Sequence, residues 1–303
     1  MRLKFYGIRG SHPTPGPDTV EYGGNTTCFT VDTPEGLKIF DLGSGAVQLG
    51  NELVTGQVDA DVFLSHQHWD HIQGFPFFKP AYVPGNELRI HGGHQRVERG
   101  REQATTIRAK DPGMNYVKGP FMDQQRKDVF PVGLDYLGAE ISFTDLEDGQ
   151  TLGDGTTVTT MYHNQHPGGM FAYRIERNGA SIGFTGDYEA DKGEEDRRMA
   201  EFMRGVDVLI ADGAYAPEDY EKKKGFGHSN VLDLCDIAAQ AEVGELLVYH
   251  PDPDYGDVIV DGLQDLCEGY MENVVQADIP VRYAREGMER EVLPILETLP
   301  MAG

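Results

Sequence analysis

The sequence predicts an α+β fold in which two β-sheets pack as a sandwich and helices lie on the outside. Two observations lead to this prediction. Short stretches rich in β-branched and aromatic residues fill much of the first two-thirds of the chain, separated by turn sequences such as TPEG and LEDGQ. Strand and helix patterns then alternate toward the end, as expected when helices cover the outer faces of sheets.

The expected strands share a content of valine, isoleucine, threonine and aromatic residues between turn signals. They lie at 3–8, 28–33, 37–43, 60–66, 139–146, 156–164, 171–177, 181–187, 206–212 and 246–250. Three later segments have the apolar spacing of helices, at 194–204, 229–243 and 255–274. Ser229 or Asn230 is a suitable N-cap for the second of them.

We expect a single domain over residues 1–303, because no linker, repeat or low-complexity segment divides the chain. Residues 91–137 carry mixed charges without clear strand periodicity. Long irregular segments in a compact domain often serve as lids or binding loops, so we interpret this stretch as an insert or lid. The segment at about 255–303 is expected to be a C-terminal helical extension.

The charge is strongly acidic, with 26 Lys+Arg against 50 Asp+Glu and a formal net charge of −24. Such a field repels polyanions, so a long nucleic-acid partner is not expected and a small-molecule substrate is favoured. No run of 18 apolar residues is present, and the N-terminus lacks the apolar core of a signal peptide. These features favour a cytoplasmic protein without a membrane partner.

The stretch SHQHWDHI concentrates three histidines and one aspartate within six residues: His66, His68, Asp70 and His71. The buried-strand pattern ADVFLSH ends at His66, so the histidines begin where a strand gives way to a loop. Residues two apart at a strand end point the same way, so His66 and His68 can share one metal ion. Imidazole and carboxylate are ligands that zinc, manganese and iron accept.

This HxHxDH pattern at a strand end resembles the signature of the metallo-β-lactamase superfamily of hydrolases. Further motifs agree in order along the chain, each with one candidate residue. IFDLGSG with Asp41 precedes the HxHxDH stretch, and QHPGGMFAYRI with His166, FTGD with Asp187, GFGHSN with His228, and LLVYHPD with His250 follow it. The resemblance covers residues 1 to about 255. It implies an αββα sandwich of two mixed sheets flanked by helices, and two divalent metal ions, zinc first with manganese or iron as alternatives.

The resemblance also implies the ligand sets. One ion is assigned to His66, His68 and His166, the other to Asp70, His71 and His250, with Asp187 bridging them. Asp41 is expected to brace the metal loop by hydrogen bonds rather than to bind an ion. His163, three residues before His166, is a rival for its role, but the HPGG context favours His166.

The histidine of GFGHSN followed by a helix, and then a strand ending in histidine, is similar to the phosphodiesterase branch of the superfamily. That branch includes tRNase Z, phosphoribosyl cyclic phosphodiesterases and cyclic-nucleotide phosphodiesterase-like proteins. The branch usually has threonine where this chain has Asn230. The resemblance implies a phosphodiesterase that cleaves a small or cyclic phosphodiester by attack of a metal-bridging hydroxide. His228 would act as general acid or contact the phosphate, and Asp70 would be a second catalytic residue.

Several alternatives stay open at this point. One is a tRNA 3′-processing endonuclease, which the net charge disfavours. Others are a thioester or lactam hydrolase on the same scaffold, and a non-catalytic module that binds metal and ligand.

Dimers are common in the superfamily, so a homodimer is among the expected states. Trp69 either lines the substrate pocket or packs behind the loop of the candidate metal ligands. Tyr215 is a weaker candidate for a side chain that faces the site. His12, His91 and His94 are expected at the surface.

Overall fold

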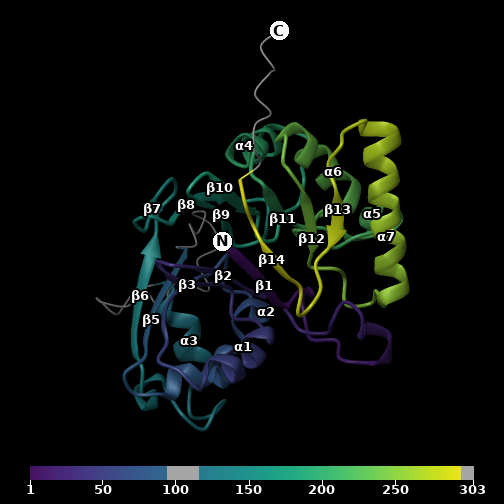
Figure 1. Cartoon of the computed structure of the whole chain (residues 1–303). Coiled ribbons are helices and arrows are strands. Elements are labelled where there is room, and N and C mark those ends of the chain that lie inside the picture. Colours follow the sequence, from purple (N-terminus) through teal and green to yellow (C-terminus); the bar gives the residue numbers. More distant parts are fainter. Residues whose placement is uncertain (94–115, 295–303) are drawn as a thin grey trace, which may run out of the picture.

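The computed structural model describes residues 1–93 and 116–294, and within these residues two seven-stranded β-sheets face each other (Figure 1). The first sheet has the order β14-β1-β2-β3-β4-β5-β6. Its strands are β1 (Arg2–Gly7), β2 (Cys28–Thr33), β3 (Gly36–Phe40), β4 (Asp59–Phe63), β5 (Glu87–Gly93), β6 (Glu140–Leu146) and β14 (Glu289–Glu291).

The second sheet has the order β13-β12-β11-β10-β9-β8-β7. Its strands are β7 (Thr151–Leu152), β8 (Thr157–His163), β9 (Met170–Arg177), β10 (Ala180–Phe184), β11 (Val208–Asp212), β12 (Leu246–Tyr249) and β13 (Val281–Tyr283). Both sheets are mixed. Strands β3 to β6 run parallel in the first sheet and β10 to β13 in the second, while the remaining neighbours pair antiparallel.

Helices cover the outer faces of both sheets, which completes the αββα sandwich that the resemblance implied (Figure 1). The α-helices are α1 (Gly45–Leu53), α2 (Trp69–Ile72), α3 (Lys118–Gln124), α4 (Glu194–Phe202), α5 (Pro217–Lys223), α6 (Val231–Gln240) and α7 (Asp257–Tyr270). A π-helical turn, Met271–Val275, continues α7. No helix in the described ranges is both long enough and apolar enough to cross a bilayer.

The core between the sheets is built from aromatic side chains on facing strands. Phe29 stacks on Phe40 with ring centroids 4.8 Å apart, and Phe184 of the other sheet meets Phe29 edge-on at 4.9 Å. Tyr173 meets Phe40 edge-on at 5.7 Å. These residues alternate with outward-facing neighbours along each strand, as the period of two requires. The sheets are therefore held rigidly, and their edges can position a site.

The C-terminal segment differs from the expected helical extension. The helix ends with the π turn at Val275, and the chain then adds β13 to the second sheet and β14 to the first. Strands of three residues carry too little pattern to be recognised in sequence, because their pairing depends on partners far away in the chain. The proposal of a single domain over 1–303 remains a prediction.

The stretch 91–137, expected as an insert or lid, is partly regular. Its first residues, 91–93, belong to β5, and residues 118–124 form α3. Residues 94–115, with His94, lie outside the described residues. Strand β5 was not predicted, because only two of its residues, Leu88 and Ile90, carry the apolar alternation of a strand. Both side chains pack in the core on the outer, helix-covered side of the first sheet.

Candidate metal centre

The candidate site lies at one edge of the sandwich, where parallel strands of both sheets end. Asp41 follows β3, and His66 follows β4. In the second sheet Asp187 follows β10, Asp212 ends β11, and His250 follows β12. The carboxyl ends of neighbouring parallel strands lie at the same edge of a sheet, so residues more than 200 positions apart meet there.

The first cluster consists of His66, His68 and His166, whose ligand nitrogens all lie within 4.8 Å of one another. His68 Nδ1 and His166 Nε2 are 2.8 Å apart. His66 and His166 are buried, whereas His68 is accessible to solvent. His166 stands in the loop between β8 and β9, which brings it from the second sheet to the loop after β4. The structure thus unites the three residues predicted for one ion.

The second cluster consists of Asp70, His71, Asp187 and His250, again with ligand atoms within 4.8 Å of one another. Asp187 Oδ2 lies 3.2 Å from His71 Nε2 and 3.3 Å from His250 Nε2. The same oxygen is 3.7 Å from His66 Nε2 of the first cluster. Asp187 therefore stands between the two clusters, where a bridging carboxylate is expected.

Buried hydrogen bonds hold the ligands from behind. Asp41 Oδ2 lies 2.8 Å from His71 Nδ1, and both oxygens of Asp41 accept hydrogen bonds from Ser65. Gly227 O lies 2.9 Å from His166 Nδ1. Such contacts orient an imidazole so that its other nitrogen faces the ion. The bracing role of Asp41 remains a prediction with which these hydrogen bonds are compatible, and its φ of 57° shows that the backbone is held in the left-handed region there.

Burial sets the protonation of the first cluster. Burial lowers the pKa of His68, lowers the pKa of His66 well below its ordinary value, and lowers the pKa of His166 to about 3. The imidazole that binds a metal is the neutral one. At neutral pH these three side chains are already in the form that a metal ion needs.

In the second cluster the carboxylates dominate. Burial lowers the pKa of His71, but the carboxylates of Asp187, Asp70 and Asp41 outweigh it and raise that pKa well above the ordinary value. Burial would raise the pKa of Asp70, yet His71 and His250 hold it well below its usual range. Three carboxylates around one imidazole form a strongly negative pocket, which a divalent cation would neutralise in place of a proton.

Two buried nitrogens test whether metal ions fit here. His66 Nε2 and His71 Nε2 have no hydrogen-bond partner among the described residues, although buried polar atoms are normally paired. Both atoms face the clusters. The donors are imidazole nitrogens and carboxylate oxygens, since the buried thiols Cys28, Cys235 and Cys267 belong to the cores. This donor set fits two divalent ions of the zinc, manganese or iron type.

A histidine and an aspartate complete the site beside the second cluster. His228 Nδ1 lies 2.7 Å from Asp212 Oδ2. The ring of His228 is stacked on that of His250 at 4.7 Å and lies 5.0 Å from that of His166. Burial lowers the pKa of His228, but the carboxylate of Asp212 more than offsets this, and the pKa rises to about 9. His228 is therefore a charged donor that faces both clusters at neutral pH.

Asp212 was missed from the sequence, although a signal was present. It ends the buried strand pattern VDVLIAD, one strand over from the strand that precedes Asp187. It is fully buried and also accepts hydrogen bonds from the backbone N–H groups of Tyr188 and Ala214. A carboxylate at the end of a fully apolar strand needs a buried partner, and this requirement could have indicated a role.

The other sequence candidates lie as follows. His163 contacts Thr185 O at 3.2 Å and belongs to neither cluster. The side chain of Trp69 is 56% exposed, so it does not pack behind the loop. Tyr215 meets the His228 ring edge-on at 5.9 Å. His91 was expected at the surface but is buried and lies 3.2 Å from Asp61, because it belongs to β5.

The chain is similar to proteins of one superfamily. The family model of the β-lactamase superfamily domain matches residues 48–250. Ribonuclease Z of Thermoplasma acidophilum is 27% identical over 305 residues, which covers 92% of this chain and 95% of that protein. Ribonuclease Z of Haloarcula marismortui is 23% identical and covers 96% of this chain and 97% of its own length.

Solved structures show the same fold. The metallo-β-lactamase fold protein YhfI from Bacillus subtilis superimposes with a TM-score of 0.68 at 20% identity, covering 95% of this chain and 98% of that one. The short form of human tRNase Z gives a TM-score of 0.63 at 16% identity, and the match covers 97% of this chain and 100% of that one. A diphosphatase of the PhnP family gives 0.62 at 16% identity, covering 98% and 99%.

Proposed function

The chain belongs to the β-lactamase superfamily, and on that premise we propose that it is a metal-dependent phosphodiesterase that hydrolyses a small or cyclic phosphodiester. The observation that carries the proposal is the pair of His228 and Asp212 beside the two clusters. A site that only stored metal would need the ligands alone. A charged imidazole aimed at the same place suits a reaction in which negative charge develops on a leaving oxygen.

The proposed ligands are those predicted from sequence. One ion would be held by His66, His68 and His166, the other by Asp70, His71 and His250, with Asp187 between them. When bound, two such ions would supply a nucleophile at neutral pH and neutralise charge on the phosphoryl oxygens. Zinc is the first candidate, with manganese or iron as alternatives.

The chain itself would perform the proton transfer. Asp212 accepts the Nδ1–H of His228 and thereby keeps the second proton on Nε2, which is the nitrogen free to face a substrate. That proton would pass to the leaving alkoxide as the phosphorus–oxygen bond breaks. Asp212 stays charged and stabilises the imidazolium before transfer.

Asp70 is the second proposed catalytic residue. Its Oδ2 accepts a hydrogen bond from the backbone N–H of Ser11 at 2.8 Å and lies 3.3 Å from His250 Nε2. These contacts hold the oxygen in a position from which it would bind the second ion, and the carboxylate would orient the attacking water. The buried walls of the site lower the local dielectric, which strengthens each of these contacts.

The size of the substrate is argued from charge. A net charge of −24 opposes a long polyanion, whereas one phosphodiester needs only the local positive charge of the site. A thioester or lactam substrate is disfavoured by His228 and not by the metal ligands, because those branches of the superfamily need no such phosphate-directed histidine. A non-catalytic module is disfavoured for the same reason.

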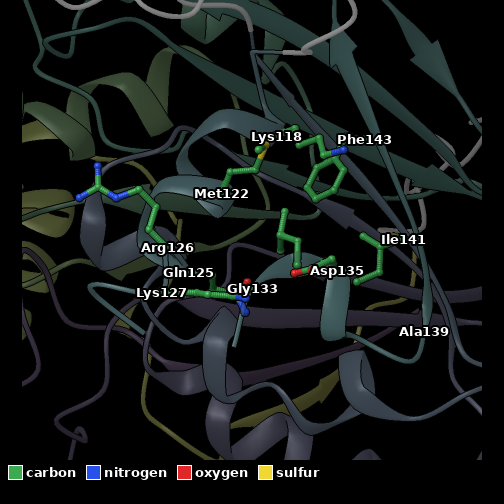
Figure 2. Close-up of a pocket in the computed structure, with 11 residues that line it drawn as sticks. Lys118, Met122, Gln125, Arg126, Lys127, Gly133, Asp135, Ala139, Ile141 and Phe143 are labelled. Carbon is green, nitrogen blue, oxygen red and sulfur yellow. The ribbon is translucent and has the colours of Figure 1, made fainter. Parts of the chain in front are cut away.

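RNA processing is a second candidate, and one observation favours it: both relatives described above are named ribonuclease Z. A cavity of about 550 Å³ beside α3 is lined by Lys118, Arg126 and Lys127, with Met122 and Phe143 among its apolar walls (Figure 2). This is a basic cluster in an acidic chain where a longer anionic substrate could make contact. It is small, however, and Arg126 is already paired with Asp128.

The experiment that separates the candidates compares substrates on one enzyme preparation. We expect the metal-loaded protein to hydrolyse cyclic and aryl phosphodiesters with a higher kcat/KM than it cleaves a precursor tRNA at its 3′ end. The replacement Lys118→Gln with Lys127→Gln serves as a control, since it should leave small-substrate kinetics unchanged. A preference for precursor tRNA that weakens in this double variant, with a salt slope smaller by about 2, would favour the RNA candidate.

A further inference from the structure

Two large aromatic side chains stand exposed beside the metal centre. Trp69 is 56% exposed and lies between His68 and Asp70, and Phe226 is 61% exposed and directly precedes Gly227. Burial of an aromatic side chain ordinarily contributes strongly to stability, so solvent exposure of two of them at one place calls for a reason.

The two residues flank one row of contacts at the first cluster. His68 is the solvent-accessible member of that cluster, which indicates that the site opens to solvent beside it. From His68 the row continues to His166 at 2.8 Å and from His166 to Gly227 O at 2.9 Å. Trp69 directly follows the first residue of this row and Phe226 directly precedes the last, so both exposed rings are carried beside the first cluster.

Within residues 1–93 and 116–294, neither ring has a packing contact that would explain its presence. Among the described residues, no ring contact or hydrogen bond involves the side chain of Trp69 or that of Phe226. The neighbouring loop is anchored instead by Ile72 and Phe75, which are buried in the outer core of the first sheet.

The backbone under both residues is nevertheless held firmly. Glu189 accepts hydrogen bonds from the backbone N–H of Gly225 at 2.7 Å and of Gly227 at 2.8 Å, which fixes the chain on either side of Phe226. Trp69 begins the short helix α2, and its carbonyl accepts from the N–H of Gln73 at 2.8 Å. Rings carried on a fixed backbone bind a planar partner without the entropy cost of ordering a loop.

We propose that Trp69 and Phe226 are specificity residues that stack on planar groups flanking the scissile phosphate. The substrates would then be phosphodiesters of nucleosides or of similar aromatic alcohols, rather than of purely aliphatic alcohols or sugars. This inference rests on the proposed phosphodiesterase function. Stacking tolerates any base, because every base offers a π-face, and it adds affinity without requiring the positive surface that this chain lacks.

The first test uses binding, so that it does not depend on turnover. Trp69 is the single tryptophan of the chain, and its fluorescence reports directly on stacking at the site. Adenosine monophosphate should quench the emission of the metal-loaded protein in a saturable manner, while ribose 5-phosphate at the same occupancy should quench it little. Equal quenching by both ligands, or none by either, would overturn the proposal even if phosphodiester hydrolysis were established.

The second test uses kinetics on two substrates, adenosine 2′,3′-cyclic phosphate and the cyclic phosphate of glycerol. Loss of one stacking contact should raise KM for the nucleotide relative to the glycerol ester by about 5- to 150-fold in Trp69→Ala and in Phe226→Ala. Trp69→Phe keeps a ring and should restore most of the difference. Phe77→Ala is the matched control, because Phe77 is 56% exposed and lies outside the site.

The outcomes distinguish failure of the stacking role from failure of the phosphodiesterase function. Hydrolysis of both esters with the same KM ratio in all variants would refute the stacking role while leaving the phosphodiesterase intact. Saturable quenching by the nucleotide without hydrolysis of either ester would refute the proposed function while supporting the stacking site.

Discussion

Replacing Asp212 by asparagine should move the alkaline limit of activity to lower pH. Asp212 Oδ2 lies 2.7 Å from His228 Nδ1 and is the main reason that the pKa of this buried histidine is raised to about 9. Asparagine has the same shape but no charge. Without the carboxylate, burial remains and favours the neutral imidazole, so the pKa should fall to its ordinary value of about 6.5 or below.

The size of the effect follows from the fraction of His228 that is protonated. At pH 8 a group with a pKa of about 9 is roughly 90% protonated, whereas one with a pKa of about 6.5 is about 3% protonated. The proton donor is therefore depleted by at least about 30-fold. The difference between the proteins should shrink steadily as the pH falls toward the lower pKa.

The assay is kcat for an aryl phosphodiester between pH 5.5 and 9.5 in both proteins, with metal content measured at each end of the range. The ratio of the kcat of the variant to that of the wild type at each pH is independent of every ionisation that the two proteins share. Asp196→Asn is the matched control, because Asp196 is also buried and accepts several hydrogen bonds but does not contact His228. A loss that is the same at every pH, or no loss at pH 8, would refute the reasoning.

Three further predictions concern the supports of the site. Asp41→Asn removes the charge that orients His71 and should weaken metal affinity by about 10- to 100-fold in chelator competition; unchanged affinity would contradict the bracing role. Burial lowers the pKa of His163 to about 4, so the folded protein holds this side chain neutral. The contribution of the neutral side chain to the free energy of unfolding is fully present above about pH 6.5 and is lost as the pH falls toward 4. At pH 5 this loss is about 2 kcal/mol, and urea unfolding of His163→Asn should lack it; equal pH dependence in both proteins would show the prediction to be wrong. Gly227→Ala places a Cβ 2.3 Å from His166 Nδ1 at a φ of 94°, so the metal stoichiometry should fall from about two toward one by elemental analysis, and a full complement would contradict the ligand assignment.

Much of the fold was predictable because its signals are local. The strands that form the centre of each sheet have dense β-branched and aromatic content, and the two mixed sheets with outer helices are confirmed. The elements that were missed depend on distant partners. Strands β13 and β14 have three residues each, and only their pairing with β12 and β1 makes them strands. Helix α1 was hidden by the glycines at its start and in its interior.

The candidate ligands were predictable for a different reason. Metal binding requires several nitrogen or oxygen donors close together, and four candidate donors lie within six residues of sequence at His66 to His71. Asp212 was not predictable in this way, since its role comes from a single contact with His228 that only the packed sheet creates. The same holds for Glu189, which fixes the loop of Phe226 from a different part of the chain.

The most direct test of the central proposal is metal content together with hydrolysis of bis(p-nitrophenyl) phosphate, in the wild type and in His228→Ala. The ligands of the two clusters are intact in this variant, so both proteins should bind about two ions per chain. Hydrolysis should fall by about 100-fold or more in the variant, as expected for loss of a general acid. Two bound ions in both proteins with equal hydrolysis, or with none in the wild type, would contradict it.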